Sequence, residues 1–226
     1  MSKYTATRTS LRTAGIMLLF AMLFTTLMST TYRFTRPAIE ASEFAERMRL
    51  INEILPPQTY DNALLEDFVV VGPTPELGVD RQARVYRARL GDEPAALIVE
   101  AIAPDGYAGR IQLAVAVSHE GRISGVRATA HSETPGLGDY IDPRKDKERA
   151  RPWITQFTGA SFDRISPQQW RVRRDGGVFE YRIGATISAR AVTEATGRAL
   201  AWTLEHRETL FEAETGSRFT RSQDND

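Results

Sequence analysis

The longest apolar run of the chain lies close to its start. Residues 14–34 read AGIMLLFAMLFTTLMSTTYRF and carry no charge before Arg33. A helix of about 20 apolar residues is long enough to cross a bilayer. A cleaved signal peptide is the alternative, because basic residues precede the run, but no A-x-A-like cleavage site follows it. The pattern predicts a short N-terminal segment, 1–13, and an uncleaved transmembrane helix, 14–34.

The next segment has the spacing of an amphipathic helix. Pro37 suits the first turn of a helix. Apolar side chains then recur at steps of four, three and four residues, at Phe44, Met48, Ile51 and Leu55. Two consecutive prolines end the pattern at 56 and 57. We expect a linker helix over 37–55 whose apolar stripe packs on the following domain or on a neighbouring protein.

From residue 84 the pattern becomes that of β-strands. Four apolar runs follow one another between 84 and 130: RVYRARL, AALIVEAIA, IQLAVAV and ISGVRATA. Turns as short as GDEP and HEGR join antiparallel neighbours. A further hairpin is expected from 170–174 and 178–183, around Asp175-Gly176-Gly177.

A long helix is expected after Thr186, with one apolar face formed by Val192, Ala195, Ala199 and Trp202. The elements together predict an α+β protein. A single N-terminal transmembrane helix precedes an antiparallel-sheet domain with flanking helices, 60–215, and a polar, loose tail follows at 216–226.

Composition narrows the chemistry. The 29 basic and 29 acidic residues cancel, so no net field attracts nucleic acid. The absence of cysteine excludes disulfides and thiolate metal centres held by this chain. The histidines at 119, 131 and 206 are too scattered to predict a metal site, and we expect the first and last of them to be solvated. The mixed-charge run 142–149 is also expected to form a solvated surface.

The loop HSETPGLGDY, 131–140, is the first candidate site. Proline restricts its backbone, and two glycines, Gly136 and Gly138, allow positive φ angles and the close approach of another group. The remaining side chains could bind a heterocycle, with polar contacts from His131, Glu133 and Thr134 and an apolar contact from Leu137. Such a loop can equally well serve only as a connection.

The second candidate is Thr186, which stands between the small pair Gly184-Ala185 and the start of the predicted helix, two residues before Ser188. One interpretation is a helix cap. The other is a covalent attachment point, because small neighbours leave the hydroxyl open and the free N–H groups of a helix start stabilise a phosphate. Residue types alone leave both interpretations open.

Four motifs behind one apolar anchor resemble a known family: GYAGRIQLAVAV, H-x-E-T-P-G-L-G, PWITQF and GAT-x-S. The chain is similar to the FMN-binding proteins that include the G component of the Rnf electron-transport complex and the C component of the sodium-pumping NADH:quinone reductase. The resemblance implies FMN bound to Thr186 through a phosphoester, installed by a separate flavin transferase. Glu180 and Ile183 stand where that family usually has aspartate and a small residue.

The resemblance also implies a function. The chain would relay electrons in a redox-driven ion pump linking ferredoxin and NAD, with no independent catalysis. Its partners would be the other membrane subunits, including a second flavin subunit and iron–sulfur subunits. The chain has no acidic residue before the apolar run, which favours a short cytoplasmic N-terminus and a flavin domain outside a bacterial inner membrane. Glu133, Thr134, Leu137 and Gly138 would surround the flavin ring.

Three alternatives remain at this point. The first is the C component of the sodium-pumping quinone reductase, which has the same cofactor and attachment. The second is a membrane-tethered scaffold without redox chemistry. The third is an anchored hydrolase that uses Thr186 or Ser188, which lacks a convincing adjacent base in the sequence.

Overall fold

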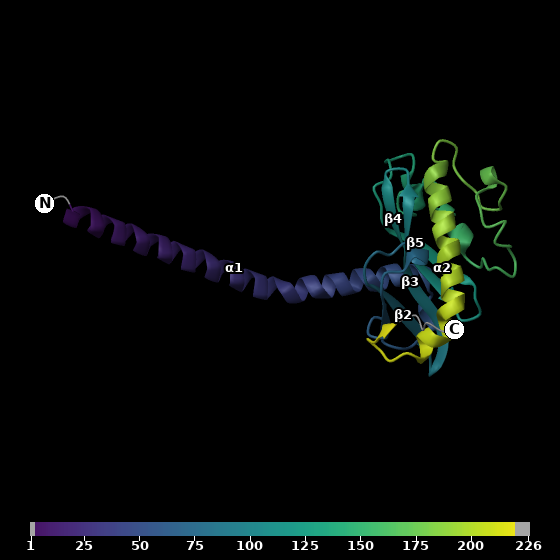
Figure 1. Ribbon diagram of the computed structural model, residues 1–226, viewed down its shortest axis with the longest axis horizontal. Coiled ribbons are helices and arrows are strands. Elements are labelled where there is room, and N and C mark those ends of the chain that lie inside the picture. The colour runs from purple at the N-terminus through teal and green to yellow at the C-terminus, as the bar shows by residue number, and fades with distance from the viewer. Residues whose placement is uncertain (1–2, 220–226) are drawn as a thin grey trace, which may run out of the picture. The chain divides into compact units, whose positions relative to one another are not determined.

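The computed structural model describes residues 3–219. The chain divides into two compact units, with the boundary between Arg49 and Leu50. The first unit consists of most of helix α1 (Lys3–Ile54), drawn as one uninterrupted ribbon in Figure 1. The expected start of a separate helix at Pro37 is therefore wrong. A proline inside a helix removes one backbone hydrogen bond without necessarily ending the helix. Arg36 and Glu40 form an ion pair of 2.7 Å across this position.

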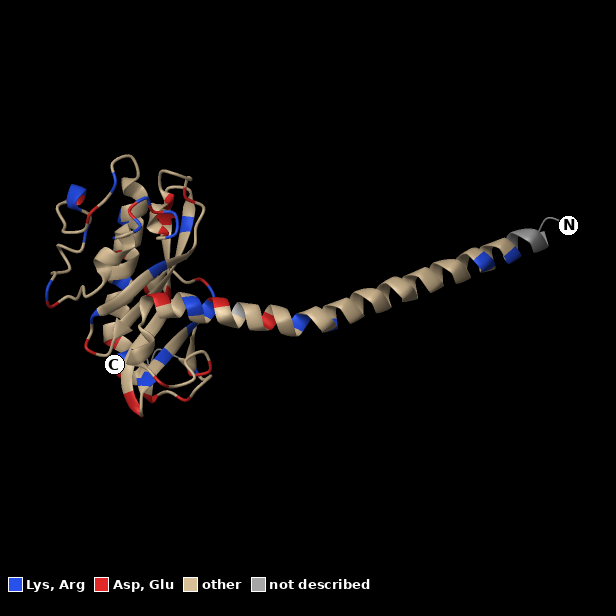
Figure 2. Cartoon of the chain, turned by 180° about the vertical axis from the view of Figure 1, so that it is seen from behind, with Lys and Arg blue, Asp and Glu red and all other residues tan. Residues whose placement is uncertain are grey.

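The helix exposes a long apolar surface. It is the one helix of the described residues that is long and apolar enough to cross a membrane, and the mean hydropathy of its most apolar stretch is 1.7. None of that stretch is buried. Figure 2 shows charged residues on both sides of an uncharged middle section. Such a surface suits the interior of a bilayer.

The second unit is built on a six-stranded sheet with the order β5-β4-β3-β2-β1-β6 (Figure 1). The strands are β1 (Phe68–Val71), β2 (Ala83–Leu90), β3 (Glu93–Gly106), β4 (Gly109–Ser118), β5 (Ile123–Ala130) and β6 (Arg218–Phe219). The four expected strands correspond to β2–β5 and are antiparallel neighbours. β6 pairs in parallel with β1, so the sheet is mixed. The tail expected to be loose therefore adds one short strand, and residues 220–226 lie outside the described residues.

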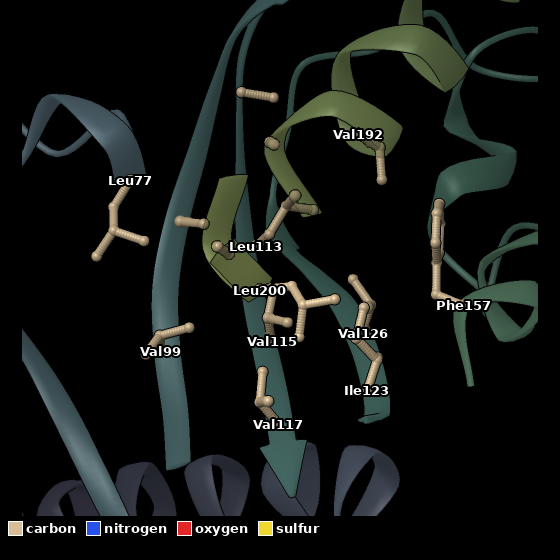
Figure 3. Packing of buried hydrophobic residues seen from close by; sticks show 14 of the residues in the cluster. Leu77, Val99, Leu113, Val115, Val117, Ile123, Val126, Phe157, Val192 and Leu200 are labelled. Atoms are coloured by element: carbon tan, nitrogen blue, oxygen red, sulfur yellow. The ribbon is translucent and has the colours of Figure 1, made fainter. Parts of the chain in front are cut away.

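The sheet separates two hydrophobic cores, because successive residues of a strand point to opposite faces. On β3, Leu97, Val99 and Ala101 belong to the larger core. Ala96 and Ile98 belong to the smaller core on the opposite face. Figure 3 shows the larger core, with strand side chains gathered against those of the C-terminal helix.

The end of α1 covers the smaller core. Ile51 and Leu55 of the expected apolar stripe are buried there together with Ile54, whereas Phe44 of the same stripe is exposed. A Cβ atom at Gly125 of β5 would lie 2.6 Å from the Cα of Ile54, so glycine allows the helix to approach the strand. An ion pair of 2.9 Å between Glu53 and Arg127 supports the same contact.

Helix α2 (Thr186–Glu212) covers the larger core. Its expected apolar face is confirmed, because Val192, Ala195, Ala199 and Trp202 are all buried. His206, expected in solvent, is instead buried and stacks on Trp202 with 4.8 Å between ring centroids. Short 3₁₀ turns connect the remaining segments: η1 (Pro57–Thr59), η2 (Pro75–Leu77), η3 (Asp139–Ile141), η4 (Trp153–Phe157) and η5 (Arg173–Asp175).

The hairpin expected at 170–183 is wrong. Its two halves form no strands, and one isolated parallel bridge joins Val172 to Phe179. Trp170, Val172 and Phe179 are all buried in the larger core. A Cβ atom at Gly177 would lie 2.0 Å from the carbonyl oxygen of Arg171, so the two halves approach one another more closely here than a residue with a side chain allows.

Candidate functional site

The two candidate stretches lie against one another. The loop after β5 and the start of α2 enclose a cleft of about 110 Å³ together with the turn between β3 and β4. The residues that line it are Tyr107, Glu133, Thr134, Leu137, Gly138, Gly184, Ala185, Ile187 and Ser188. Tertiary structure thus brings together segments that lie about fifty residues apart in the sequence.

Glu133 connects the walls of the cleft. Its side chain is buried, and one carboxylate oxygen accepts a hydrogen bond from the hydroxyl of Ser188. The other oxygen accepts the backbone N–H of Ala108 at 3.2 Å. A buried carboxylate requires such donors, because desolvation without them is costly. The loop, the β3–β4 turn and α2 are therefore held by one side chain.

The two glycines of the loop have different roles. Gly136 has a φ angle of +74° and open space beside it, so its backbone conformation is what favours glycine. Gly138 has an ordinary φ of −94°, but a Cβ atom there would lie 2.7 Å from Glu133 Oε2 and 2.9 Å from Ser188 Oγ. Glycine at 138 consequently protects the contact between loop and helix.

His131 supports the loop from outside the cleft wall. Its Nδ1 accepts the backbone N–H of Glu133 at 3.2 Å, which places the proton of the neutral ring on Nε2. Partial burial lowers the pKa of His131, and the positive charge of Lys145 lowers it further. The imidazole therefore stays neutral to a lower pH than an exposed histidine.

Thr186 does not cap α2. The cap position belongs to Ala185, and no side chain makes a capping hydrogen bond. Thr186 is itself 6% exposed, and its hydroxyl oxygen lies 3.4 Å from Nη1 of Arg174. Its sequence neighbours Ala185 and Ile187 both line the cleft, but Thr186 itself does not. Gly184, with φ +89°, makes the turn that leads into the helix.

A buried cluster holds the backbone before Thr186. The hydroxyl of Tyr140 donates to the carbonyl of Ala185 at 3.2 Å and accepts the N–H of Arg182 at 3.4 Å. The Arg182 guanidinium lies over the Tyr140 ring and pairs with Asp146. Burial raises the pKa of Tyr140 to about 12. This cluster fixes the path of the chain into α2.

Asp146 corrects the expectation of a solvated run at 142–149. Asp142 and Asp146 are both buried, and Asp146 also accepts the backbone N–H of Trp153 at 2.7 Å. Residue types gave no sign of this, since an aspartate among lysines and arginines is usually a surface residue. The roles of Tyr107, Tyr140 and Arg174 were likewise not visible in the sequence, although Tyr140 ends the candidate loop.

The chemistry available here is the binding of a ligand. The Thr186 hydroxyl lies against a guanidinium, which cannot accept a proton, whereas the Ser188 hydroxyl donates to the Glu133 carboxylate. Both oxygens of that carboxylate already accept hydrogen bonds from neighbouring segments, which suits a structural contact. Within residues 3–219 no group of three or more His, Cys, Asp and Glu side chains is arranged to hold a metal ion. The partly exposed side chains of Tyr107, Leu137 and Ile187 instead offer apolar surface to a planar ligand.

Comparison with known proteins identifies an FMN-binding domain in the part of the chain that forms this cleft. Residues 1–54 match the family model of the RnfG N-terminal region, and residues 106–201 match that of the FMN-binding domain. Relatives named as the G component of an ion-translocating oxidoreductase complex occur in Shewanella loihica and Pseudomonas aeruginosa. The first is 39% identical over 90% of this chain and 94% of the relative. The second is 41% identical over 92% and 94%, respectively. A Vibrio cholerae relative of the same name is 36% identical over 89% and 94%. The chain belongs to the RnfG family, the G components of ion-translocating oxidoreductase complexes.

Proposed function

We propose that this chain carries one FMN, attached to Thr186 through a phosphoester, and relays electrons within a membrane complex. Membership of the family makes the chain a membrane-associated FMN subunit of an ion-translocating oxidoreductase. The observation that carries covalent attachment is the position of Thr186. Thr186 is the first residue of α2 and stands in the sequence between Ala185 and Ile187, which both line the cleft.

The dimensions of the cleft support a tethered ligand. Its volume of about 110 Å³ is small, whereas pockets that bury a drug-sized ligand usually have about 300–1,000 Å³. Leu137 is 47% exposed and Ile187 44%, so they can cover part of a flavin ring while the rest faces solvent. Burial alone would hold such a ligand weakly, and a covalent bond removes that limitation. An exposed ring edge also lets electrons pass to a docked partner.

The attachment reaction needs an activated phosphate. With a flavin dinucleotide as donor, the Thr186 oxygen forms a bond to the phosphorus on the flavin side. The pyrophosphate bond breaks, a nucleoside monophosphate leaves, and a base of the flavin transferase takes the hydroxyl proton and releases it to solvent. Because the structure records no base at Thr186, the proton acceptor belongs to the separate flavin transferase.

The residues of the cleft position the ring. When bound, FMN can accept electrons in pairs and release them singly. Glu133 is held in place by two hydrogen bonds, so its carboxylate would keep its position beside a bound flavin and would influence the reduction potential of that flavin. Thr134, Leu137 and Gly138 complete that wall.

We place the relay between ferredoxin and NAD, coupled to movement of sodium ions or protons. A second flavin subunit and iron–sulfur subunits are its partners, and the sequence has no cysteine with which to hold such a cluster itself. The flavin domain faces the outside of a bacterial inner membrane. The match of the N-terminal region and the names of the relatives favour this assignment over the sodium-pumping quinone reductase.

The test compares the wild-type chain with Thr186→Val, each produced together with the flavin transferase. Valine preserves the shape of threonine and removes the oxygen. We expect flavin fluorescence in the denatured wild-type band, and none in the variant, with the mass of one FMN missing from the intact variant. Ser188→Ala is the matched control and should keep its label. Fluorescence of fully denatured Thr186→Val would show that the attachment lies elsewhere, and an unlabelled wild-type chain would show that FMN is bound without a covalent bond.

A further inference from the structure

Several arginine side chains surround the segment that presents Thr186, and three of them form ion pairs. Arg173 pairs with Glu180 at 2.8 Å, and Arg190 pairs with Asp175 at 2.5 Å. Arg182 pairs with the buried Asp146. In the part of the chain that the structure describes, Arg174 has no such carboxylate partner, and its guanidinium lies against the Thr186 hydroxyl.

The backbone turn that carries Arg174 is firmly held. The N–H of Arg173 donates to the carbonyl of Phe179 at 2.8 Å. The N–H of Asp175 donates to the carbonyl of Val172 at 2.9 Å. Both Val172 and Phe179 are buried in the larger core. The ion pair of Asp175 with Arg190 connects the turn to α2, and the hydrogen bond from Arg190 lowers the pKa of Asp175. The approach of Arg174 to Thr186 therefore follows from the fold.

The proposed attachment places a negatively charged phosphate close to Arg174. A phosphate joining a flavin to threonine is a diester with one negative charge, on the two oxygens not engaged in ester bonds. A guanidinium matches two such oxygens with parallel N–H donors. The side chain of Arg174 is exposed. It can therefore leave the hydroxyl when the new bond forms and then pair with the phosphate.

We propose that Arg174 is the phosphate-binding residue of this site, pairing with the phosphodiester on Thr186 and promoting its formation. This inference rests on the proposed attachment of FMN to Thr186. Arg174 binds the donor phosphate while the bond to the Thr186 oxygen forms, and it holds the product afterwards.

The experiment follows flavin incorporation into the full-length chain, purified in detergent, by the flavin transferase and a flavin dinucleotide. Intact mass gives the rate, and phosphorus NMR of the labelled protein reports on the phosphate itself. The variants are Arg174→Gln, Arg174→Lys and the matched control Arg171→Gln, which removes an exposed arginine from the same segment. We expect about a tenfold slower incorporation for Arg174→Gln, the size of a lost charge-assisted hydrogen bond. Arg174→Lys should lie between, and Arg171→Gln should stay close to wild type.

The phosphorus resonance decides the result. A shifted resonance in Arg174→Gln that is absent from Arg171→Gln supports the proposal, as does complete loss of label from a variant that unfolds at the wild-type temperature. An unchanged resonance, whatever the rate of incorporation, overturns it, because Arg174 then only covers the hydroxyl. A wild-type chain without flavin, or a labelled Thr186→Val, contradicts the attachment itself and removes both proposals.

Discussion

Glu133, on the loop after β5, accepts a hydrogen bond from Ser188 in the first turn of α2, although 55 positions separate them in the sequence. The same carboxylate accepts the N–H of Ala108 between β3 and β4. A single buried side chain thus joins the three segments around the cleft. The hydrogen bonds of Glu133 therefore determine how rigidly these three segments hold the cleft.

The first prediction concerns this contact. Glu133→Gln and Ser188→Ala should each lower the free energy of unfolding by about 1–3 kcal/mol, because each leaves a buried polar group with a poorer partner. The loss of unfolding free energy in the double variant should be smaller than the sum of the two single losses, because the two side chains interact directly. The difference should exceed about 0.5 kcal/mol. Urea denaturation followed by circular dichroism measures all three. Additive losses would mean that the two residues do not stabilise one another.

The second prediction separates the two glycines of the loop. Gly136→Ala meets no neighbouring atom but must adopt a φ of +74°, and should cost about 1–2 kcal/mol of stability. Gly138→Ala has an acceptable backbone conformation, but its Cβ would collide with Glu133 and Ser188. We expect the second variant, and not the first, to change flavin absorption as well as stability. Identical spectra for Gly138→Ala and wild type would contradict this role.

The third prediction concerns the pH dependence of stability at Tyr140. Its pKa is about 12 in the folded protein, against an ordinary value of 10, because burial disfavours the phenolate. A group with a raised folded pKa contributes stability in full below the unfolded pKa and loses it as pH rises through the folded value. Unfolding free energy should therefore fall between pH 10 and 12, by at most about 2–3 kcal/mol.

Tyr140→Phe provides the comparison for that measurement. It removes the titrating group together with the hydrogen bond to Ala185. The variant should be less stable than wild type at neutral pH by about 1–2 kcal/mol. The difference between the two proteins should shrink as pH rises from 10 to 12. A constant difference over this interval would show that Tyr140 does not titrate as its burial requires.

The fourth prediction concerns the anchor. The apolar side chains between 14 and 34 are exposed along α1, so we expect the whole chain to sediment with membranes and to resist extraction by high salt. A chain beginning at residue 50, which retains the second unit, should stay in the soluble fraction. N-terminal sequencing of the membrane form provides the check. A mature start beyond Phe34 would mean that the run is a cleaved signal.

The local sequence pattern was sufficient to predict most of the helices and strands of this protein. The apolar run at 14–34, the alternation along 84–130 and the apolar face of 186–202 predicted the anchor helix, β2–β5 and α2. Each of these signals lies within one continuous segment and repeats at the period of its own element. The motifs at 131–138 and 184–188 identified the candidate site for the same reason, because each is complete within a few residues.

Tertiary structure decided what lies between such segments. β1 and β6 are too short to show a periodic pattern. The sequence of 170–183 is typical of a hairpin, but in the structure Trp170, Val172 and Phe179 are instead buried in the larger core. The burial of Asp146 depends on Arg182, and the approach of Arg174 to Thr186 depends on a turn tied to α2. A periodic pattern reports which face of an element is buried. It does not report which distant side chain occupies that face, because this depends on how separate elements pack together.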